Sequence, residues 1–424
     1  MDRILGAKNY KSSRLRLLAI VALAALMAGI YWLRLPRPQP IGDNYRVYVG
    51  SSTSIDGKGI YLFRLHATGK VEAVGLAAGG SLWQPKTGSL KRIPARVLGQ
   101  FRADWPDVNS MFMGVRNPEF LAAHPNGRYL YTANPQTAGA VSAFQINRES
   151  GKLTLLNTEY SGGESPDFLA IDSTGNFLLV ANYGGTLAVI PIDPDGRLRP
   201  VTSVLQQKRG EMESPRVSRP HAIAISPDNR FAIVPDTGLD RVFVYKFDAK
   251  KGELVANDPA FVEFSPGASP RHFVFAPNGQ FGYAVGESGS CVMAMRWDAQ
   301  RGVLTPIQTI STLPPDFRRG NAGADLLIDP SGRFLYASNR GHDSIAVFAV
   351  DSATGKLTPV QIESSYGERP ANLLMDPAGS YLFAADIASS RVVKFHIDPQ
   401  TGRLDPIEYF SAPSPMAMVL LPPR

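Results

Sequence analysis

The stretch Pro330-Ser331-Gly332-Arg333-Phe334 joins two short apolar runs, and its pattern recurs through most of the chain. The pattern is Pro-(Asn/Ser/Ala)-Gly-x-(Phe/Tyr), in which proline and glycine favour a tight turn and the aromatic residue opens a strand. Copies and variants of it begin at Pro125, Ser173, Pro227, Pro277 and Pro377. The third positions of the six turns are 48, 54, 50, 53 and 47 residues apart. This spacing indicates a repeated unit of about 50 residues.

A second turn, of the form Gly-x-(Leu/Val), recurs seven times. Its glycines are Gly69, Gly151, Gly196, Gly252, Gly302, Gly355 and Gly402. A run rich in Val, Ile and Phe precedes each of these turns, for example at residues 345–350. About four strands in about 50 residues is the period of a β-propeller blade. The seven second turns therefore predict an all-β fold, a seven-bladed β-propeller over residues 44–424.

The two ends of the repeated region predict how the ring closes. Residues 45–65 begin part-way through a unit, without an inner strand before them, whereas residues 414–419 resemble the start of the other units. The last strand is thus expected to complete the first blade, which removes open sheet edges. Residues 79–117 break the period. We interpret them as an inter-blade insertion that forms a surface loop, although such an insertion is also long enough to cover one mouth of the ring.

The amino-terminal region predicts a membrane anchor. A basic tail at residues 1–16 precedes an uncharged apolar run at 17–33, and a proline-rich tether follows at 34–43. The run has the length of a short membrane-spanning helix, and no small-x-small cleavage site follows it, which favours an uncleaved signal anchor over a signal peptide. Five basic residues before the run and two after it place the tail in the cytoplasm. We expect a single-pass inner-membrane protein with a periplasmic or other extracytoplasmic propeller.

Charge and cysteine content exclude several classes of partner. The net charge is +7, but residues 1–40 carry seven of the 44 basic residues and one of the 37 acidic ones. The rest of the chain is almost neutral, which argues against a nucleic-acid partner. Cys291 is the only cysteine, so an internal disulfide and a multi-cysteine zinc site are excluded. The six histidines show no metal-ligand spacing, and we expect no metal and no cofactor.

Equivalent positions in the repeats locate a candidate site. Side chains at one position of each inner strand face the centre of the ring. Eight residues before the third position of each first turn stand Glu119, Asp167, His221, Arg271, Ala324 and Ala371. Eight residues after it stand Pro135, Tyr183, Thr237, Glu287, Arg340 and Ile387. Four ionisable residues from three consecutive blades are expected to converge at the channel mouth: His221, Arg271, Glu287 and Arg340. They form either an acid–base and anion-holding site or an ion-pair network that joins blades.

Four motifs are distinctive: Pro220-His221-Ala222, Pro270-Arg271-His272-Phe273, Ala181-Asn182-Tyr183-Gly184-Gly185 and Ser338-Asn339-Arg340-Gly341-His342-Asp343-Ser344. They resemble the seven-bladed β-propeller lactonase family, which includes 6-phosphogluconolactonases and carboxy-cis,cis-muconate cyclase. The resemblance covers residues 44–421 and implies that His221, Arg271, Glu287 and Arg340 are catalytic. Where family members often carry Pro-Cys-His and Pro-Arg-Asn, this chain has Pro166-Asp167-Phe168 and Pro370-Ala371-Asn372.

The function that we expect is opening of a sugar-acid or related anionic lactone by a 6-phosphogluconolactonase-like hydrolase. His221 is expected to be the general base, Glu287 to orient it or return a proton, and Arg271 and Arg340 to hold an anionic group and the oxyanion. Tyr183 and Asn339 are candidate substrate-binding residues. His272 and His342 are interpreted as packing or rim residues. Two alternatives remain: a muconate-type cycloisomerase, and a non-catalytic periplasmic propeller that binds a ligand or a protein partner.

Overall fold

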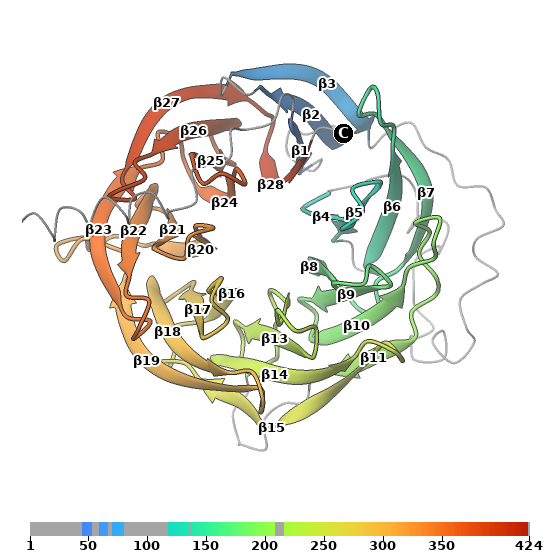
Figure 1. Cartoon of the computed structure of the whole chain (residues 1–424), viewed down its shortest axis with the longest axis horizontal. Helices are drawn as coiled ribbons and strands as arrows, with labels where there is room; N and C mark the ends of the chain where they lie inside the picture. Colours follow the sequence, from blue (N-terminus) through green and yellow to red (C-terminus); the bar gives the residue numbers. More distant parts are fainter. Residues whose placement is uncertain are drawn as a thin grey trace, which may run out of the picture. The chain divides into compact units, whose positions relative to one another are not determined.

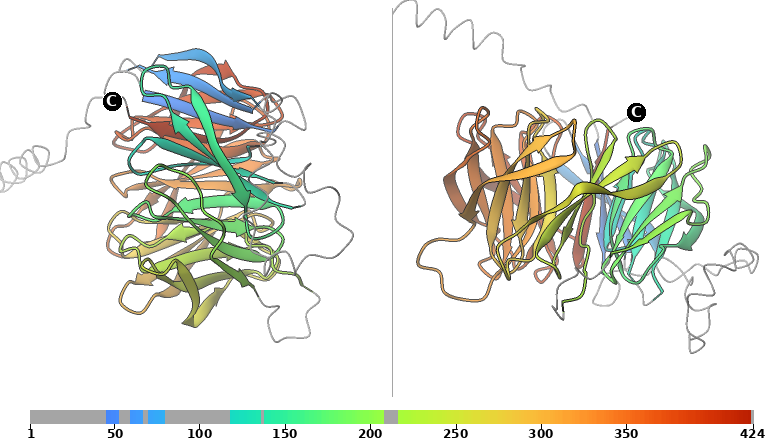
Figure 2. Two further views of the ribbon diagram at one scale, coloured as in Figure 1. Left: turned by 90° about the vertical axis from the view of Figure 1, so that its right-hand side faces the viewer. Right: turned by 90° about the horizontal axis from the view of Figure 1, so that it is seen from below.

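The computed structural model describes residues 45–52, 59–66, 70–79, 118–135, 138–207 and 216–422. In these residues 28 strands form seven four-stranded antiparallel sheets. The sheets are the blades of a ring (Figure 1). Side views show a ring that is wider than it is thick (Figure 2). The structure confirms the prediction of an all-β, seven-bladed propeller.

Each blade runs from an inner strand beside the centre of the ring to an outer strand at its rim (Figure 1). The blade that holds both ends of the repeated region comprises β28 (Pro415–Leu421), β1 (Tyr45–Ser51), β2 (Gly59–Leu65) and β3 (Val71–Gly79). The next two blades comprise β4 (Phe120–Ala123), β5 (Tyr129–Asn134), β6 (Ala140–Ile146) and β7 (Leu153–Tyr160), then β8 (Pro166–Ile171), β9 (Phe177–Asn182), β10 (Thr186–Pro191) and β11 (Ser203–Gln206).

The remaining four blades follow in chain order. The first two comprise β12 (Ala224–Ile225), β13 (Phe231–Asp236), β14 (Arg241–Asp248) and β15 (Glu253–Glu263), then β16 (Pro270–Phe275), β17 (Phe281–Gly286), β18 (Cys291–Asp298) and β19 (Val303–Ser311). The last two comprise β20 (Ala322–Ile328), β21 (Phe334–Arg340), β22 (Ser344–Val350) and β23 (Leu357–Ser364), then β24 (Pro370–Met375), β25 (Tyr381–Asp386), β26 (Arg391–Ile397) and β27 (Leu404–Ser411).

The last strand closes the ring. β28 pairs with β1 in antiparallel register, from Arg46 opposite Leu421 to Gly50 opposite Ala417. The strand from the end of the chain is therefore the inner strand of the first blade, as the repeat register predicted. Closure leaves no inner strand unpaired at the junction of the two ends, so the ring does not present an open edge there.

The two recurring turns contact one another between neighbouring blades. Gly355 of a second turn has a φ of +73°, and a Cβ atom placed on it would lie 2.4 Å from the ring of Phe281, the aromatic residue of the preceding blade's first turn. The Tyr283 hydroxyl donates a hydrogen bond to the Gly355 carbonyl over 3.1 Å. The same glycine–aromatic contact recurs in the pairs Gly196–Tyr129, Gly252–Phe177, Gly302–Phe231 and Gly402–Phe334. Glycine is required at these turns for both its backbone conformation and its lack of a side chain.

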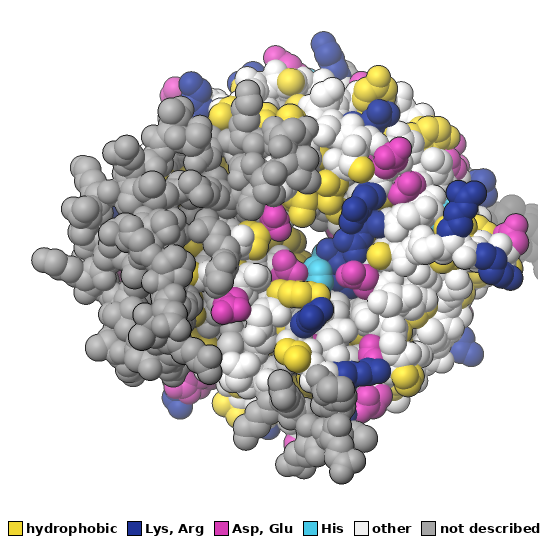
Figure 3. Space-filling view, turned by 180° about the vertical axis from the view of Figure 1, so that it is seen from behind, with side chains coloured by type: hydrophobic (Ala, Val, Ile, Leu, Met, Phe, Trp, Pro, Cys, Tyr) yellow, Lys and Arg dark blue, Asp and Glu magenta, His cyan; other side chains and the backbone are white. Residues whose placement is uncertain are grey.

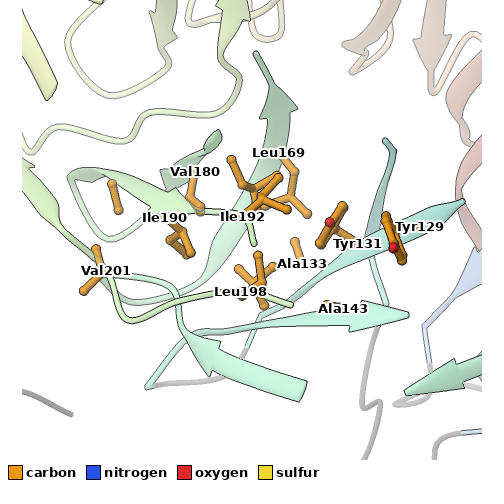
Figure 4. Packing of buried hydrophobic residues seen from close by; sticks show 13 residues of the cluster. Tyr129, Tyr131, Ala133, Ala143, Leu169, Val180, Ile190, Ile192, Leu198 and Val201 are labelled. Atoms are coloured by element: carbon orange, nitrogen blue, oxygen red, sulfur yellow. The ribbon is translucent and has the colours of Figure 1, made fainter. Parts of the chain in front are cut away.

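The hydrophobic core lies between blades as well as within them. One cluster combines Tyr131 and Val141 of one blade with Leu178, Val180 and Ile190 of the next, all fully buried (Figure 4). Apolar side chains on both faces of each sheet are removed from water, which is the main stabilising contribution. This packing fixes the inner strands relative to one another and so positions the residues at their ends.

The predicted tail (1–16), anchor (17–33) and tether (34–43) lie outside the described residues, as does the predicted insertion apart from Gly79. Within the part of the chain that the structure describes, no helix has the length and apolar character needed to cross a membrane.

Candidate active site

A repeated β-bulge positions side chains at the start of the inner strands. In β16, Pro270 pairs with Gly286 and His272 pairs with Val285, which leaves Arg271 as an extra residue. The same irregularity leaves Asp167 in β8, Ala371 in β24 and Met416 in β28. A bulge changes the direction of a side chain and ends regular pairing. In the blades of Asp167, Arg271 and Ala371, the position eight residues before the third residue of the first turn is therefore structurally distinct.

A cavity at the centre of one face of the ring collects these side chains. Figure 3 shows acidic, basic and histidine side chains around this hollow. It is lined by Glu119, Phe120, Asp167, His221, Arg271, His272, Arg340, Ala371, Asn372, Ile387 and Met416. The repeat register thus identified the position that faces the cavity in five of the blades. The residues at this position are Glu119, Asp167, His221, Arg271 and Ala371.

Three of the four predicted catalytic residues form an ion-paired group. Oε2 of Glu287 lies 3.1 Å from Nε of Arg271 and 3.2 Å from Nη2 of Arg340. Nη1 of Arg271 also donates a hydrogen bond to the Ala324 carbonyl over 2.7 Å. Burial, together with the nearby Arg271, lowers the pKa of Arg340 to about 10. Arg340 remains charged at neutral pH. Glu287 holds the guanidinium groups of Arg271 and Arg340 close together.

The fourth predicted residue, His221, pairs with an acid instead. Its Nε2 atom lies 3.3 Å from Oδ2 of Asp167 in the neighbouring blade. Burial lowers the pKa of His221 well below its usual value, and the charge of Arg271 adds to this effect. Burial also raises the pKa of Asp167 to about 6. Near neutral pH the imidazole is therefore uncharged beside a carboxyl group that titrates close to the working range.

A second acidic residue lies in the same cavity. Glu119 precedes β4, in the blade next to that of Asp167. Burial raises the pKa of Glu119 to about 7, and the neighbouring Asp167 contributes to this increase. The repeat register had placed both acids among the residues facing the centre, but their chemical role did not follow from position alone.

His272 borders the cavity and is also packed against its neighbours, as the sequence suggested. Its Nδ1 atom lies 2.7 Å from Oδ1 of Asp325. Oδ2 of Asp325 accepts hydrogen bonds from Nδ2 of Asn372 over 2.7 Å and from the Leu373 amide over 2.8 Å. Oδ1 of Asn372 accepts from the Met418 amide over 2.8 Å. This buried network joins four blades beside the cavity. The signal in the sequence was the position of Asp325, directly after the ring residue Ala324.

Asn339 does not reach the cavity. Its side chain is fully buried, its Nδ2 group donates to the Thr312 carbonyl and Ser344 Oγ, and its Oδ1 atom accepts from Thr312 Oγ1 and Asn321 Nδ2. Its hydrogen bonds go to Ser344 and Asn321 and to Thr312, which follows the outer strand of the neighbouring blade. Asn339 is therefore a structural residue and not the substrate-binding donor that the sequence suggested.

Tyr183 and His342 lie around the site and do not line it. The Tyr183 ring meets the His221 ring edge-on with centroids 5.9 Å apart, and the Arg219 guanidinium lies over the Tyr183 ring at 5.3 Å. Nδ1 of His342 lies 2.7 Å from Ser344 Oγ, and the Phe317 ring packs against it. Among the described side chains, no group of three or more His, Cys, Asp or Glu is arranged to hold a metal ion.

Comparisons with known proteins agree with this fold. The family described as "Lactonase, 7-bladed beta-propeller" matches residues 106–420. A 6-phosphogluconolactonase of Bacillus subtilis (strain 168) is 32% identical over 329 residues, which are 77% of this chain and 83% of the relative. A 6-phosphogluconolactonase of Formosa agariphila is 32% identical over 269 residues, 60% of this chain and 74% of the relative.

Among solved structures, a periplasmic gluconolactonase of Pseudomonas aeruginosa is similar to the whole propeller. It is 27% identical, with a TM-score of 0.77, and the similarity covers 90% of this chain and 100% of that one. The resemblance inferred from the motifs is thereby confirmed. Because the family match spans most of the propeller and includes the cavity residues, the chain belongs to the seven-bladed β-propeller lactonase family.

Proposed function

We propose that the protein is a lactone hydrolase whose active site is the cavity around His221, Asp167, Arg271, Glu287 and Arg340. One observation carries the proposal: two guanidinium groups, held together by Glu287, face the same cavity as an uncharged imidazole paired with a carboxyl group. The names of its relatives, 6-phosphogluconolactonase and gluconolactonase, support the same reaction class.

The arginines supply electrostatic stabilisation. Attack of water on a lactone carbonyl places negative charge on the carbonyl oxygen. Arg271 and Arg340 are 11% and 15% exposed, so their attraction for that charge is weakened little by solvent. Guanidinium N–H groups that are fixed before the reaction favour the transition state over the substrate. Glu287 contacts both arginines, so we assign it the role of positioning them rather than of orienting His221.

The His221–Asp167 pair supplies proton transfer. Water loses a proton as it attacks, and the ring oxygen gains one as the carbon–oxygen bond breaks. A pair with one group that is neutral at pH 7 and one with a pKa of about 6 accepts the first proton and returns it. The Tyr183 ring, edge-on against His221, fixes the direction of the imidazole, which makes Tyr183 a positioning residue.

The cellular location forms part of the proposal. The apolar run at residues 17–33 and the similarity to a periplasmic gluconolactonase support a propeller outside the cytoplasm, attached to the inner membrane. Protease added to spheroplasts tests it. Digestion of the propeller in intact spheroplasts is expected, whereas digestion only after lysis contradicts this location.

Ring opening by the purified full chain tests the activity. The substrates are glucono-1,5-lactone, its 6-phosphate and a muconolactone-type acid, each corrected for spontaneous opening. Arg271→Ala is expected to lower kcat/KM by about a hundredfold or more. The control Arg241→Ala removes an ion pair with the exposed Glu263, which lies outside the cavity, and is expected to keep wild-type turnover. A folded wild type that opens none of these lactones contradicts the proposal and favours the binding-module alternative. Full turnover in Arg271→Ala contradicts the proposal that Arg271 stabilises the developing negative charge.

A further inference from the structure

The cavity lining divides into sectors of different chemistry. Around the ring from β28, the position at the start of each inner strand is occupied by Met416, Glu119, Asp167, His221, Arg271, Ala324 and Ala371. Glu119 and Asp167 form an acidic sector. Arg271 and Arg340 form a cationic sector. Ala371, Ile387 and Met416 form an apolar sector.

The cationic sector has little positive charge to spare. Glu287 already neutralises one of its two charges through contacts with both guanidinium groups. Asp167 lies close enough that both arginines act on its pKa, so its carboxylate offsets much of the second charge. A phosphate group carries between about one and a half and two negative charges near neutral pH, about as many as both arginines together. Binding a phosphate group requires positive charge that these carboxylates already offset.

The apolar sector has no cationic side chain at Ala371, although the equivalent backbone position in another blade carries Arg271. Ser269-Pro270-Arg271 and Arg369-Pro370-Ala371 share the same backbone, with a positive φ before the proline and a bulge after it. Arg271 uses this backbone to bring a guanidinium to the cavity, and Ala371 brings only a methyl group. An anionic group placed against Ala371, Ile387 and Met416 would lose water without gaining a donor, which is costly.

The acidic sector is suited to hydroxyl groups. Carboxyl oxygens accept hydrogen bonds from hydroxyl groups, and a protonated carboxyl also donates one. With a pKa of about 7, Glu119 is present in both forms at neutral pH, so it accepts from or donates to a sugar hydroxyl. Asp167 beside it repels a phosphate but not a neutral hydroxyl.

We propose that the substrate is an uncharged polyhydroxylated lactone and that the acidic and apolar sectors select against its phosphorylated form. The carbonyl faces Arg271 and Arg340, hydroxyl groups bond to Glu119 and Asp167, and the C–H face of the sugar lies on the apolar sector. This inference rests on the proposed function. It differs from the anionic substrate that the sequence suggested, because both arginines are paired with Glu287 and the cavity also holds Asp167 and Glu119.

Two arginines at the rim do not change this assignment. Arg219 and Arg369 are exposed, and Arg219 is engaged with the Tyr183 ring and hydroxyl. Solvent and salt screen exposed charges. They attract anions towards the mouth, but they do not replace a buried cation where the lactone binds.

The ratio of kcat/KM for glucono-1,5-lactone to that for its 6-phosphate tests the inference. The full chain is expected to favour the neutral lactone by about tenfold or more, since each 1.4 kcal/mol of repulsion is about a factor of ten. Ala371→Arg places a cation at the apolar sector and is expected to shift the ratio about tenfold towards the phosphate. Glu119→Gln removes a negative charge, keeps the hydrogen-bonding groups and shifts the ratio in the same direction. Ile407→Arg, on the outer strand β27, adds the same charge away from the cavity and is expected to leave the ratio unchanged.

The outcomes separate this inference from the proposed function. A wild type that opens the phosphorylated lactone equally well or better overturns the inference and leaves lactone hydrolysis standing. The inference is also overturned if the ratio of kcat/KM values in both Glu119→Gln and Ala371→Arg equals that of the wild type. If Ala371→Arg does not fold, the wild-type ratio and Glu119→Gln still decide. A folded wild type that opens neither compound contradicts the proposed function, and the inference fails with it.

Discussion

His221 and Asp167, from neighbouring blades, face one another across 3.3 Å between Nε2 and Oδ2. Burial disfavours charge on both, so it lowers the pKa of the imidazole and raises that of the carboxyl group to about 6. Their distance allows one proton to be shared between them. The two groups therefore titrate as a pair, and activity is expected to report the charge of the pair rather than of either residue.

Asp167→Asn tests this pairing. In the wild type, kcat/KM is expected to rise with pH through an acid limb near pH 6, as the pair loses its shared proton. The amide cannot ionise, so the variant is expected to lose about a hundredfold in kcat together with that limb. Arg241→Ala, outside the cavity, is the control and should keep the limb. pH–rate profiles of the three proteins check this. If Asp167→Asn keeps the acid limb unchanged, the limb arises from the ionisation of another group.

Asp325→Asn is expected to destabilise the protein by about 3 kcal/mol at neutral pH, because it breaks a buried network that joins four blades. Burial favours a higher pKa for Asp325, but the His272 interaction and the backbone amides hold the pKa below its usual value. A carboxyl group with a depressed folded-state pKa contributes its full stability above the unfolded pKa of about 3.9, and this stability is lost as the pH falls through the folded-state pKa. Urea unfolding at several pH values is the measurement. Wild type and variant should differ at pH 7 and converge below pH 4. A pH-independent difference contradicts the assigned charge.

Asp386 is expected to show the opposite pH dependence. It is fully buried, and among the described residues only the Ser365 side chain approaches its carboxyl group as a donor, outside regular hydrogen-bond geometry. Burial raises its pKa to about 7. The unfolded chain therefore gives up this proton first, and stability is lost as the pH rises from about 4 to 7. The equivalent residue Asn182 donates from Nδ2 to the Ser161 carbonyl over 3.1 Å, and Asn339 donates to the Thr312 carbonyl over 3.0 Å.

Asp386→Asn is thus expected to place the same donor at the Ser365 carbonyl and to raise the free energy of unfolding at pH 8 by about 2 kcal/mol. The gain should shrink towards pH 4, where the wild-type carboxyl group is protonated in both states. Denaturant midpoints at the two pH values measure it. A variant that is no more stable than the wild type at pH 8 means that Asp386 is not held in an unfavourable charged state.

The sequence predicted those features that repeat. Turns, blade number, ring closure and the cavity-facing position all follow from a pattern that occurs six or seven times, so each copy supports the others. The chemical role of the residue at each cavity-facing position was harder to predict from the sequence. The partner of His221 is Asp167, which lies in another blade, and no spacing along the chain reveals that contact. Asn339 illustrates the same limit, because it adjoins Arg340 in sequence while its side chain is used up by Thr312, Ser344 and Asn321.

The contact between the two recurring turns gives a prediction about the fold itself. Gly355 and Gly279 both have positive φ, +73° and +67°, so alanine at either position is expected to cost about 1–2 kcal/mol from backbone strain. Around Gly279 a Cβ atom would meet nothing within 4 Å, whereas at Gly355 it would lie 2.4 Å from the Phe281 ring. Gly355→Ala should therefore lose more stability than Gly279→Ala, by about 1–3 kcal/mol, because the buried ring has to move.

Chemical unfolding of both variants separates the two costs, since Gly279→Ala carries the backbone strain alone. Adding Phe281→Leu to Gly355→Ala frees space at the contact. It is expected to recover part of the extra loss, so the double variant should be more stable than the two single effects added together predict. Equal losses in the two alanine variants, or strict additivity in the double variant, would mean that the glycine at the second turn is required only for its backbone. The recurrence of both motifs would then not arise from their contact between blades.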